Sequence, residues 1–166
     1  MFCRNIKNRL SDPLNLENTF FGKDLDLSQN EAMCYYPENE EWHPITFHTN
    51  LTGTMGAGGL TSTAKEINIF YDALFTKQLF SKETLDQMTT PKNGMGMGIS
   101  VDRRRGYQVF GHDGRIDGFR SVAAYFPEEK LSIACTFNAS KVSSSKTLFQ
   151  LLDAYLYTVK HNSKSR

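Results

Sequence analysis

The alternation of apolar and polar residues is clearest between Gly106 and Asn138, where it predicts three consecutive antiparallel strands. The first strand leads through Val109 and Phe110 to the triplet His112-Asp113-Gly114 at its end. The other two strands, separated by a polar, proline-containing loop at 127–130, carry Phe119, Val122, Ala124 and Phe126 and then Leu131, Ile133, Cys135 and Phe137. The triplet places an ionisable side chain beside a glycine that lets a ligand approach closely, so it predicts a site.

Apolar residues at helical spacing predict helices on both sides of this strand region. One begins at about Thr63, where Thr63 and Glu66 fit a capping box. A shorter helix follows from Ser81 and ends at Thr90-Pro91. The last helix covers about residues 144–160 and carries, on one face, Leu148, Leu151, Leu152, Tyr155 and Val159.

The rest of the chain is less regular. We expect a short helix from Cys3 to Leu10, a turn at residues 11–13, an irregular polar segment over 22–52 and a glycine-rich turn over 54–59. Residues 94–101 read as a glycine-rich strand, with the arginine run at 103–105 forming its turn. These elements predict a single α/β domain of the α+β type over residues 1–166, with an antiparallel sheet of about four strands and helices packed on it.

Composition narrows the choice of partners. The chain has 166 residues, an apolar content of 39% and a formal net charge of +1, which favours a globular protein without a strongly electrostatic partner. The basic stretches at 103–105 and 160–166 are short, so we expect no nucleic-acid binding. No long apolar run is present, so we expect no membrane span.

The cysteines and the start of the chain leave the compartment open. The three cysteines are Cys3, Cys34 and Cys135, and Cys135 alternates with core residues as a buried apolar side chain would. A reducing compartment, and so a cytoplasmic protein, follows if Met1 is the true start. Periplasmic or secreted localisation follows if an export signal lies upstream.

Metal and cofactor sites are not indicated. Cys34, His43 and His48 do not have the spacing of a standard zinc site. The glycine clusters at 56–59 and 94–98 lack the order of phosphate-binding loops. We therefore expect neither a metal nor a cofactor.

Several segments in the same order resemble the serine β-lactamase and penicillin-binding protein family, in its class C β-lactamase, D-aminopeptidase and esterase branch. IKNRLSDPLNLENT at 6–19 is similar to the segment PLGM-x-x-T, and GGLTSTA at 58–64 to GGL-x-ST-x-x-D. Residues 94–98 resemble the YGLGW strand, residues 111–119 resemble GHGG-x-x-GF, and Phe137-Asn138 matches a closing TN. The resemblance covers most of the chain and implies the C-terminal part of the β-lactamase/transpeptidase-like fold.

The resemblance also implies roles for individual residues. The family uses Ser-x-x-Lys, Tyr-x-Asn or Tyr-Ser-Asn, and Lys-Thr-Gly or His-x-Gly, and only the third has a match here, at His112 and Gly114. His112 is then expected to tune proton transfer, Gly114 to leave room for substrate, and the main-chain N–H of Arg115 to form half of an oxyanion hole. Asp113 and Gly118 are expected to border the substrate. Asp113 stands where the family has a small or hydroxyl residue, and Asp117 where it often has proline.

Two segments spell Ser-x-x-Lys without being expected to act as nucleophiles. Ser62-Thr63-Ala64-Lys65 and Ser143-Ser144-Ser145-Lys146 both lie at helix starts, where serine and threonine serve as caps. The other two catalytic motifs lie upstream of the PLGM-like segment in the family. We therefore expect this chain to begin after its nucleophile.

Two functions remain open from the sequence. One is an incomplete β-lactamase-related serine hydrolase domain, acting on amide or ester bonds and inactive by itself. The other is a non-catalytic binding or interaction module derived from that family. The expected partners are a small peptide, an ester or a β-lactam-like ligand, and a second copy paired through an exposed sheet edge.

Overall fold

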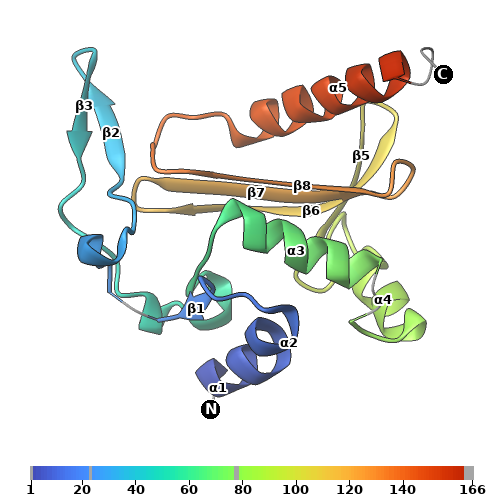
Figure 1. Ribbon diagram of the computed structural model, residues 1–166, viewed down its shortest axis with the longest axis horizontal. Coiled ribbons are helices and arrows are strands. Elements are labelled where there is room, and N and C mark those ends of the chain that lie inside the picture. The colour runs from blue at the N-terminus through green and yellow to red at the C-terminus, as the bar shows by residue number, and fades with distance from the viewer. Residues whose placement is uncertain (1, 23, 77–78, 163–166) are drawn as a thin grey trace.

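A central sheet lies between two helices, and these three layers hold the two cores of the protein (Figure 1). The computed structural model describes residues 2–22, 24–76 and 79–162. The sheet has the order β5-β6-β7-β8, all antiparallel, with β5 at Ser100–Arg104, β6 at Tyr107–Ile116, β7 at Phe119–Phe126 and β8 at Leu131–Phe137. This four-stranded meander confirms the predicted fold class.

Tight turns set the register of the sheet. Arg105 and Gly106 between β5 and β6 have φ values of 54° and 89°, the conformation that two-residue hairpin loops favour. Asp117 opens the turn between β6 and β7 with a φ of 48°. Two predictions were wrong here. Because the register continues from Tyr107 to Ile116, the His112 triplet lies inside β6 and not at its end. The strand expected over 94–101 begins only at Ser100, because residues 94–98 form turns with positive φ at Gly94 and Gly98.

Each face of the sheet packs against its own helix. On one face α5, Ser144–Asn162, covers a buried cluster of Val109, Val122, Ala124, Phe126, Cys135, Leu148 and Leu152. On the other face α3, Ala64–Phe75, packs Tyr71 against Ala123 and Tyr125. The ring of Phe75 stacks on Tyr125 with centroids 4.4 Å apart. The alternation along β7 thus serves both cores, and Cys135 is buried as expected.

The apolar face expected for the last helix is only partly packed. Leu148 and Leu152 are buried in the cluster beneath α5, whereas Leu151, Tyr155 and Val159 remain exposed at 44%, 38% and 44%. The predicted helix is therefore present, and only two of the five side chains on this face are buried. Within the described residues, no helix has the length and apolarity needed to cross a membrane.

The start of α3 is tied to the N-terminal segment by one buried carboxylate. Thr63 is the N-cap and its hydroxyl accepts the N–H of Glu66, as the capping box predicts. The Glu66 carboxylate does not return to Thr63. It accepts the backbone N–H and side-chain amide of Asn18 and, at 2.6 Å, the Thr19 hydroxyl. Glu66, which the sequence indicated as part of a local cap, therefore joins α3 to the distant N-terminal segment.

The N-terminal segment is helical for longer than the sequence indicated. α1 spans Phe2–Ile6, a π-helical turn follows at Lys7–Ser11, and α2 covers Asp12–Leu14. The turn expected at 11–13 was wrong because Pro13 stands in the first turn of α2, where a missing N–H costs nothing. The segment ends at Asn15, which has a left-handed conformation.

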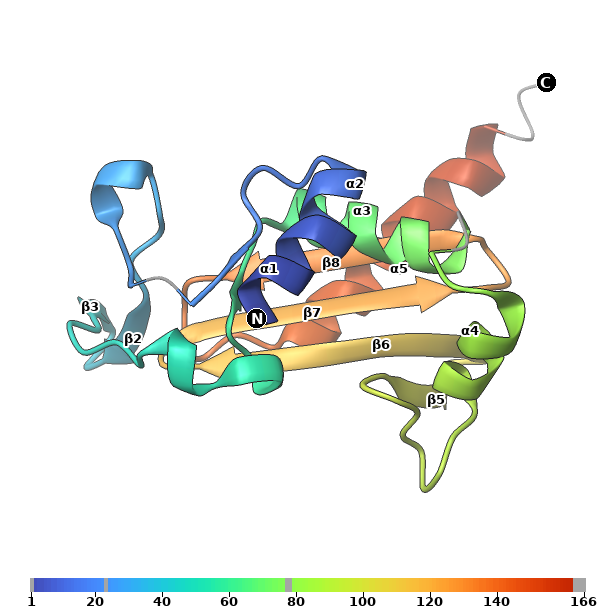
Figure 2. The ribbon, with the colours of Figure 1, turned by 90° about the horizontal axis from the view of Figure 1, so that it is seen from below.

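The segment expected to be irregular contains a hairpin. β2, Tyr35–Glu38, pairs with β3, Glu41–Pro44, and this hairpin projects from the body of the molecule (Figures 1 and 2). Its turn uses Asn39 and Glu40, both at positive φ, which is a weaker sequence signal than Asn-Gly. The two-residue strands β1, Phe20–Phe21, and β4, Leu60–Thr61, also pair with each other.

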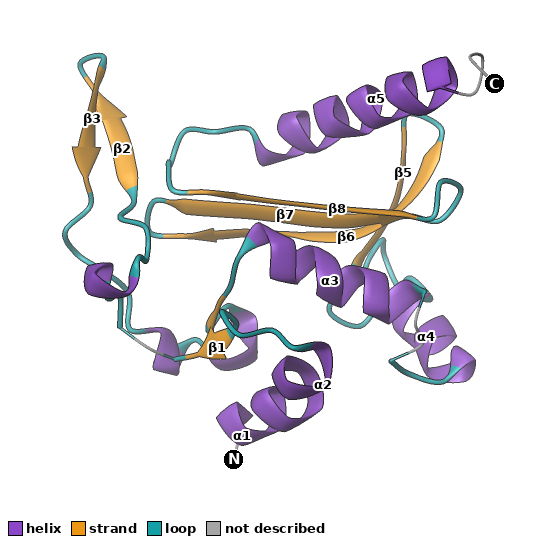
Figure 3. Cartoon of the chain, viewed as in Figure 1, coloured by secondary structure: helices purple, strands orange, loops and turns teal. Residues whose placement is uncertain are grey.

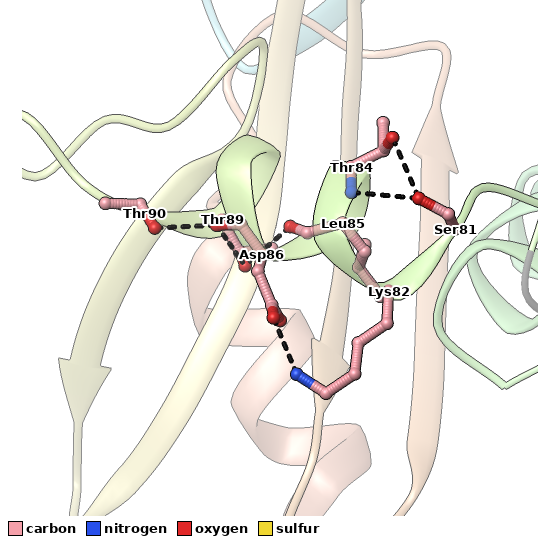
Figure 4. A network of polar contacts seen from close by, with 7 residues as sticks. All are labelled: Ser81, Lys82, Thr84, Leu85, Asp86, Thr89 and Thr90. Carbon is pink, nitrogen blue, oxygen red and sulfur yellow. Dashed lines mark hydrogen bonds and ion pairs between the residues drawn. The ribbon is translucent and has the colours of Figure 1, made fainter.

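The short helix after α3 matches its prediction. α4, Lys82–Thr89, begins after Ser81, whose hydroxyl accepts the N–H of Thr84, and it ends before Pro91 (Figures 3 and 4). Lys82 and Asp86 form an exposed ion pair one turn apart at 2.6 Å, and such pairs contribute little to stability. The helix is held mainly by its caps and by the chain that follows, through the bond from Met97 N–H to the Met88 carbonyl.

We predict that Glu66→Ala lowers the free energy of unfolding by about 1–3 kcal/mol, because the donors of Asn18 and Thr19 lose their acceptor in a partly buried place. Urea unfolding followed by circular dichroism measures this. Glu17→Ala, an exposed carboxylate next to the same segment, is the control and should change stability by less than about 0.5 kcal/mol. Equal losses in the two variants would contradict the anchoring role.

The same anchor should be sensitive to acid. Burial by itself raises the pKa of Glu66, and the hydrogen bonds from Thr19 and Asn18 outweigh it, so that the net pKa is lowered. The stability contributed by the carboxylate is therefore complete above the ordinary pKa of about 4.3 and is lost as the pH falls through the lowered value. The stability difference between the wild-type protein and Glu66→Gln should shrink in that window.

Candidate functional site

The second half of β6 has an open edge. Tyr107 faces Arg104 across a two-residue turn, and Ile116 faces Phe119 across another. Because the first and fourth residues of such a turn bond to each other, odd-numbered residues of β6 bond towards β5 and even-numbered ones towards β7. The pairing with β5 stops at Gly111, so the main-chain groups of Asp113 and Arg115 face an edge that no described strand covers.

His112 lies at the start of this open edge, on the face of the sheet that carries α3. Its ring is exposed, and the Nδ1–H donates to the carbonyl of Asp113 at 2.6 Å. A carbonyl can only accept, so Nδ1 carries the proton in this bond, and Nε2 has the lone pair when the ring is neutral. The imidazole is thus held in the tautomer that can accept a proton at Nε2.

A small cavity adjoins His112 between α3 and the sheet. It has a volume of about 170 Å³ and is lined by Ile67, Tyr71, His112, Asp113, Ser121, Val122 and Ala123. Burial raises the pKa of Tyr71 to about 12, against a smaller opposing effect of a hydrogen bond from the main chain of His112. Tyr71 therefore stays neutral near pH 7 and contributes a hydroxyl, not a phenolate, to this cavity.

The two glycines of the predicted site, Gly114 and Gly118, pack against different residues. A Cβ on Gly114 would lie 2.4 Å from the Ser121 hydroxyl, so the Ser121 side chain occupies the space beside this glycine on the α3 face of β6. A Cβ on Gly118 would lie 2.6 Å from the Ile45 side chain and 3.1 Å from Cys34 Cβ. Gly118 is therefore buried under the segment that follows β3, and contacts that segment directly.

Asp117 is a residue whose role the sequence did not reveal. Its carboxylate accepts the N–H of Thr49 at 2.9 Å and the Thr49 hydroxyl at 2.7 Å, and His48 Nδ1 lies 4.0 Å away. Together with the contacts of Gly118, these bonds fasten residues 45–49 onto the tip of the β6–β7 hairpin. The partners are 68 positions apart in the chain, so no local pattern could have indicated them.

Asp113 and Arg115 send their side chains to the opposite face from His112, because side chains alternate along a strand. There they border a groove of about 530 Å³ between the sheet and the start of α5. The predicted site residues therefore do not converge on one point. His112 and Gly114 lie on the α3 side, and Asp113 and Arg115 reach the α5 side, while their main chain shares one edge.

Comparison with known proteins identifies the family. The beta-lactamase family model matches residues 1–155. The chain belongs to the beta-lactamase family. This confirms the resemblance carried by the separate segments of the sequence.

Solved structures of this beta-lactamase fold agree. A D-stereospecific amidohydrolase from Streptomyces sp. is 25% identical with a TM-score of 0.73, over 89% of this chain and 47% of that one. The D-amino acid amidase from Ochrobactrum anthropi SV3, complexed with L-phenylalanine amide, is 21% identical with a TM-score of 0.76, over 97% and 52%. An octameric penicillin-binding protein homologue from Pyrococcus abyssi is 23% identical with a TM-score of 0.75, over 93% and 37%. The chain thus spans about half the length of the first two proteins and 37% of the third.

Within the described part of the chain, no hydrogen bond joins the serine of either Ser-x-x-Lys segment to the side chain of its lysine. The Ser62 hydroxyl lies 2.7 Å from the Thr19 hydroxyl, within the anchor around Glu66. Ser143 caps α5 by accepting the N–H of Lys146 at 3.4 Å. Among the described residues, His, Cys, Asp and Glu side chains form no group of three that could hold a metal ion.

We predict that Gly118→Ala destabilises the protein by about 1–3 kcal/mol, because the new methyl group would overlap with Ile45 and Cys34. Gly53→Ala is the matched control, since a Cβ there meets no atom within 4 Å and Gly53 has no positive φ. Chemical unfolding of both variants tests this. A destabilisation by Gly53→Ala as large as that by Gly118→Ala would contradict the packing role of Gly118.

Proposed function

We propose that this chain is the part of a β-lactamase-related serine hydrolase that supplies the His-x-Gly strand, and that it acts on amide or ester bonds together with a segment that carries the nucleophile. Membership of the beta-lactamase family supports the hydrolase class. The similarity to the D-stereospecific amidohydrolase favours amides over esters as the substrates.

The open edge of β6 is the observation that carries this proposal. An acyl-transfer enzyme needs N–H donors aimed at the oxygen that becomes negative in the transition state. The N–H of Arg115 points away from β7, and β5 does not reach it. It is therefore free to donate to such an oxygen.

His112 has the properties of a proton acceptor beside that edge. The bond of Nδ1–H to the Asp113 carbonyl leaves Nε2 available, and the ring is exposed. We assign to His112 the tuning of proton transfer at the nucleophile and to Arg115 N–H half of the oxyanion hole.

The nucleophile is the missing component. Ser62 and Ser143 have structural partners, and the relatives are about twice as long as this chain. We propose that Ser-x-x-Lys and Tyr-x-Asn come from a segment outside these 166 residues, and that the chain alone does not turn over substrate. Asp113 would disfavour substrates with a carboxylate next to the reacting bond, as in β-lactams.

A chimaera tests this proposal. The portion of the Ochrobactrum anthropi amidase that this chain does not cover would be placed ahead of Met1. We expect a fluorophosphonate probe to label a serine of the added portion and the chimaera to hydrolyse an amino acid amide, while residues 1–166 alone remain unlabelled. A folded chimaera that is neither labelled nor active would overturn the proposal.

The role of the Arg115 N–H can be separated from that of its side chain in the same chimaera. Arg115→Pro removes the N–H at a position where the ladder with β7 does not use it, and should lower kcat about 10²–10³-fold. Arg115→Ala keeps the N–H and should retain kcat within about threefold. Similar kcat values for the two variants would refute the oxyanion role.

A non-catalytic binding module is the second function that the structure favours, because the described serine–lysine segments serve as caps and anchors. In that case the chain alone should bind D-phenylalanine amide without hydrolysing it, and His112→Ala should weaken binding. Isothermal titration with product analysis by chromatography measures both. Release of ammonia by the isolated chain would exclude a purely binding role.

Self-association belongs to the same proposal. Within the described strands β8 pairs only with β7, and its residues, Leu131–Phe137, include neither a charge nor a proline. Such an unprotected edge is a surface on which another strand can pair. A strand from a second copy of the chain, or from the proposed missing segment of the hydrolase, would pair with the main-chain groups of this β8 edge.

A further inference from the structure

The outer edge of β8 presents main-chain groups that no described residue pairs. The turn between β6 and β7 directs the odd-numbered residues of β7 towards β6 and the even-numbered ones towards β8, so the odd-numbered residues of β8 bond back to β7. The residues with outward main-chain groups are therefore Ser132, Ala134 and Thr136. Beyond the strand the edge is closed, because the carbonyl of Asn138 accepts the N–H of Tyr35.

The sequence of this strand, LSIACTF, is complementary to itself. Residues at equal distance from Ala134 are alike, and the pairs are Leu131 with Phe137, Ser132 with Thr136, and Ile133 with Cys135. An antiparallel copy centred on Ala134 therefore places apolar residues opposite apolar ones and hydroxyls opposite hydroxyls. The same register pairs even-numbered residues with each other, and these have the outward main-chain groups. A centre at Ile133 or Cys135 would instead oppose residues that already bond to β7.

One hydroxyl of this strand is buried without a partner. The Oγ of Ser132 is shielded from water and forms no hydrogen bond with the described residues. In the register centred on Ala134 it would face Thr136 of a second copy, and the side chain of Thr136 is exposed. Serine and threonine in such cross-strand pairs bond to each other and stabilise the pairing. The second copy would therefore satisfy this side chain as well as the main chain.

An exposed apolar flank of α5 lies on the same side of the molecule as this edge. Arg105, in the turn between β5 and β6, binds Asp153, so the flank of α5 that carries Asp153 faces the β5 side of the sheet. Leu151 and Tyr155 stand two residues before and after Asp153, about 200° around the helix axis. They therefore face the β8 side, and both side chains are exposed.

Symmetry would bring the two α5 helices into contact. The two-fold axis of an antiparallel strand pair is perpendicular to the sheet, so both helices would lie on the face away from α3 (Figure 1). Because α5 contacts both β7 and β8, its axis lies near the middle of that strand pair. With strands about 4.8 Å apart, the two helices would be about 10 Å apart, which is a distance at which helices pack.

We propose that this chain forms a symmetric dimer in which β8 pairs antiparallel with β8 of a second copy, centred on Ala134, and the two α5 helices meet through Leu151 and Tyr155. The self-complementary sequence of β8 identifies the partner as this chain itself. The same surface serves both copies, so the assembly closes at two. The open edge of β6 faces away from this interface, and the pairing does not depend on the proposed hydrolase function.

Sedimentation equilibrium of the 166-residue chain tests the assembly. We expect a reversible equilibrium of monomer and dimer without larger species. Thr136→Lys should weaken dimerisation at least about tenfold, because a lysine on an edge strand opposes pairing. Gln87→Lys adds the same charge at an exposed position of α4, and this control should dimerise like the wild-type protein. Circular dichroism reports whether each variant is folded.

Two results would overturn the dimer. One is a wild-type chain that stays monomeric at about 100 μM, a concentration at which a dimer of micromolar affinity forms. The other is equal dimerisation of folded Thr136→Lys and wild-type protein, which would place the contact elsewhere on the surface.

Cysteine cross-linking tests the register. Cys3→Ser first removes the exposed thiol. In that background Ala134→Cys places two thiols at the two-fold axis, with Cα atoms about 5.5 Å apart, which a disulfide can span. Ser132→Cys is the matched control, because its two copies would lie about 14 Å apart along the paired strands. We expect a disulfide-linked dimer of Ala134→Cys alone on a non-reducing gel. Equal cross-linking of both variants would overturn the proposed register.

Discussion

The unequal pairing of β6 is the constraint on which the rest of the site depends. This strand bonds to β7 along its length from Phe110 to Ile116, whereas β5 accompanies it only as far as Gly111. A strand that is held on one side and open on the other is rigid and yet presents free N–H groups. The N–H groups of Asp113 and Arg115 therefore point outward from a strand whose conformation the bonds to β7 already hold. Such preorganised donors are what the binding of an oxyanion requires.

The period of two along β6 divides the chemistry between the faces of the sheet. His112 and Gly114 lie towards α3, beside the small cavity with Tyr71, and Asp113 and Arg115 lie towards α5. One short motif thus contributes to two separate environments. The α3 side carries the imidazole of His112 and the neutral phenol of Tyr71, and the α5 side carries the Asp113 carboxylate and the Arg115 guanidinium.

Two carboxylates outside the predicted site hold the framework around this strand. Glu66 binds the N-terminal segment to α3, and Asp117 binds residues 45–49 to the tip of the β6–β7 hairpin. Gly118 completes the second anchor by packing under Ile45 and Cys34. Residues 15–19 and 45–49 form no long helix or strand of their own. The carboxylates of Glu66 and Asp117 therefore determine where these two segments lie beside the sheet.

The sequence by itself determined the meander and the helices at 64–75 and 82–89, because these depend on periodicity and local caps. The order of its short motifs indicated the family. It missed the β2–β3 hairpin and the helical turn at Pro13, whose local signals are weak or ambiguous. Only the tertiary structure decided that the pairing of β6 with β5 stops at Gly111, that Asp117 binds Thr49 and that Arg115 opposes Arg120. Strand register and contacts across many residues arise from packing, which no single segment of the chain encodes.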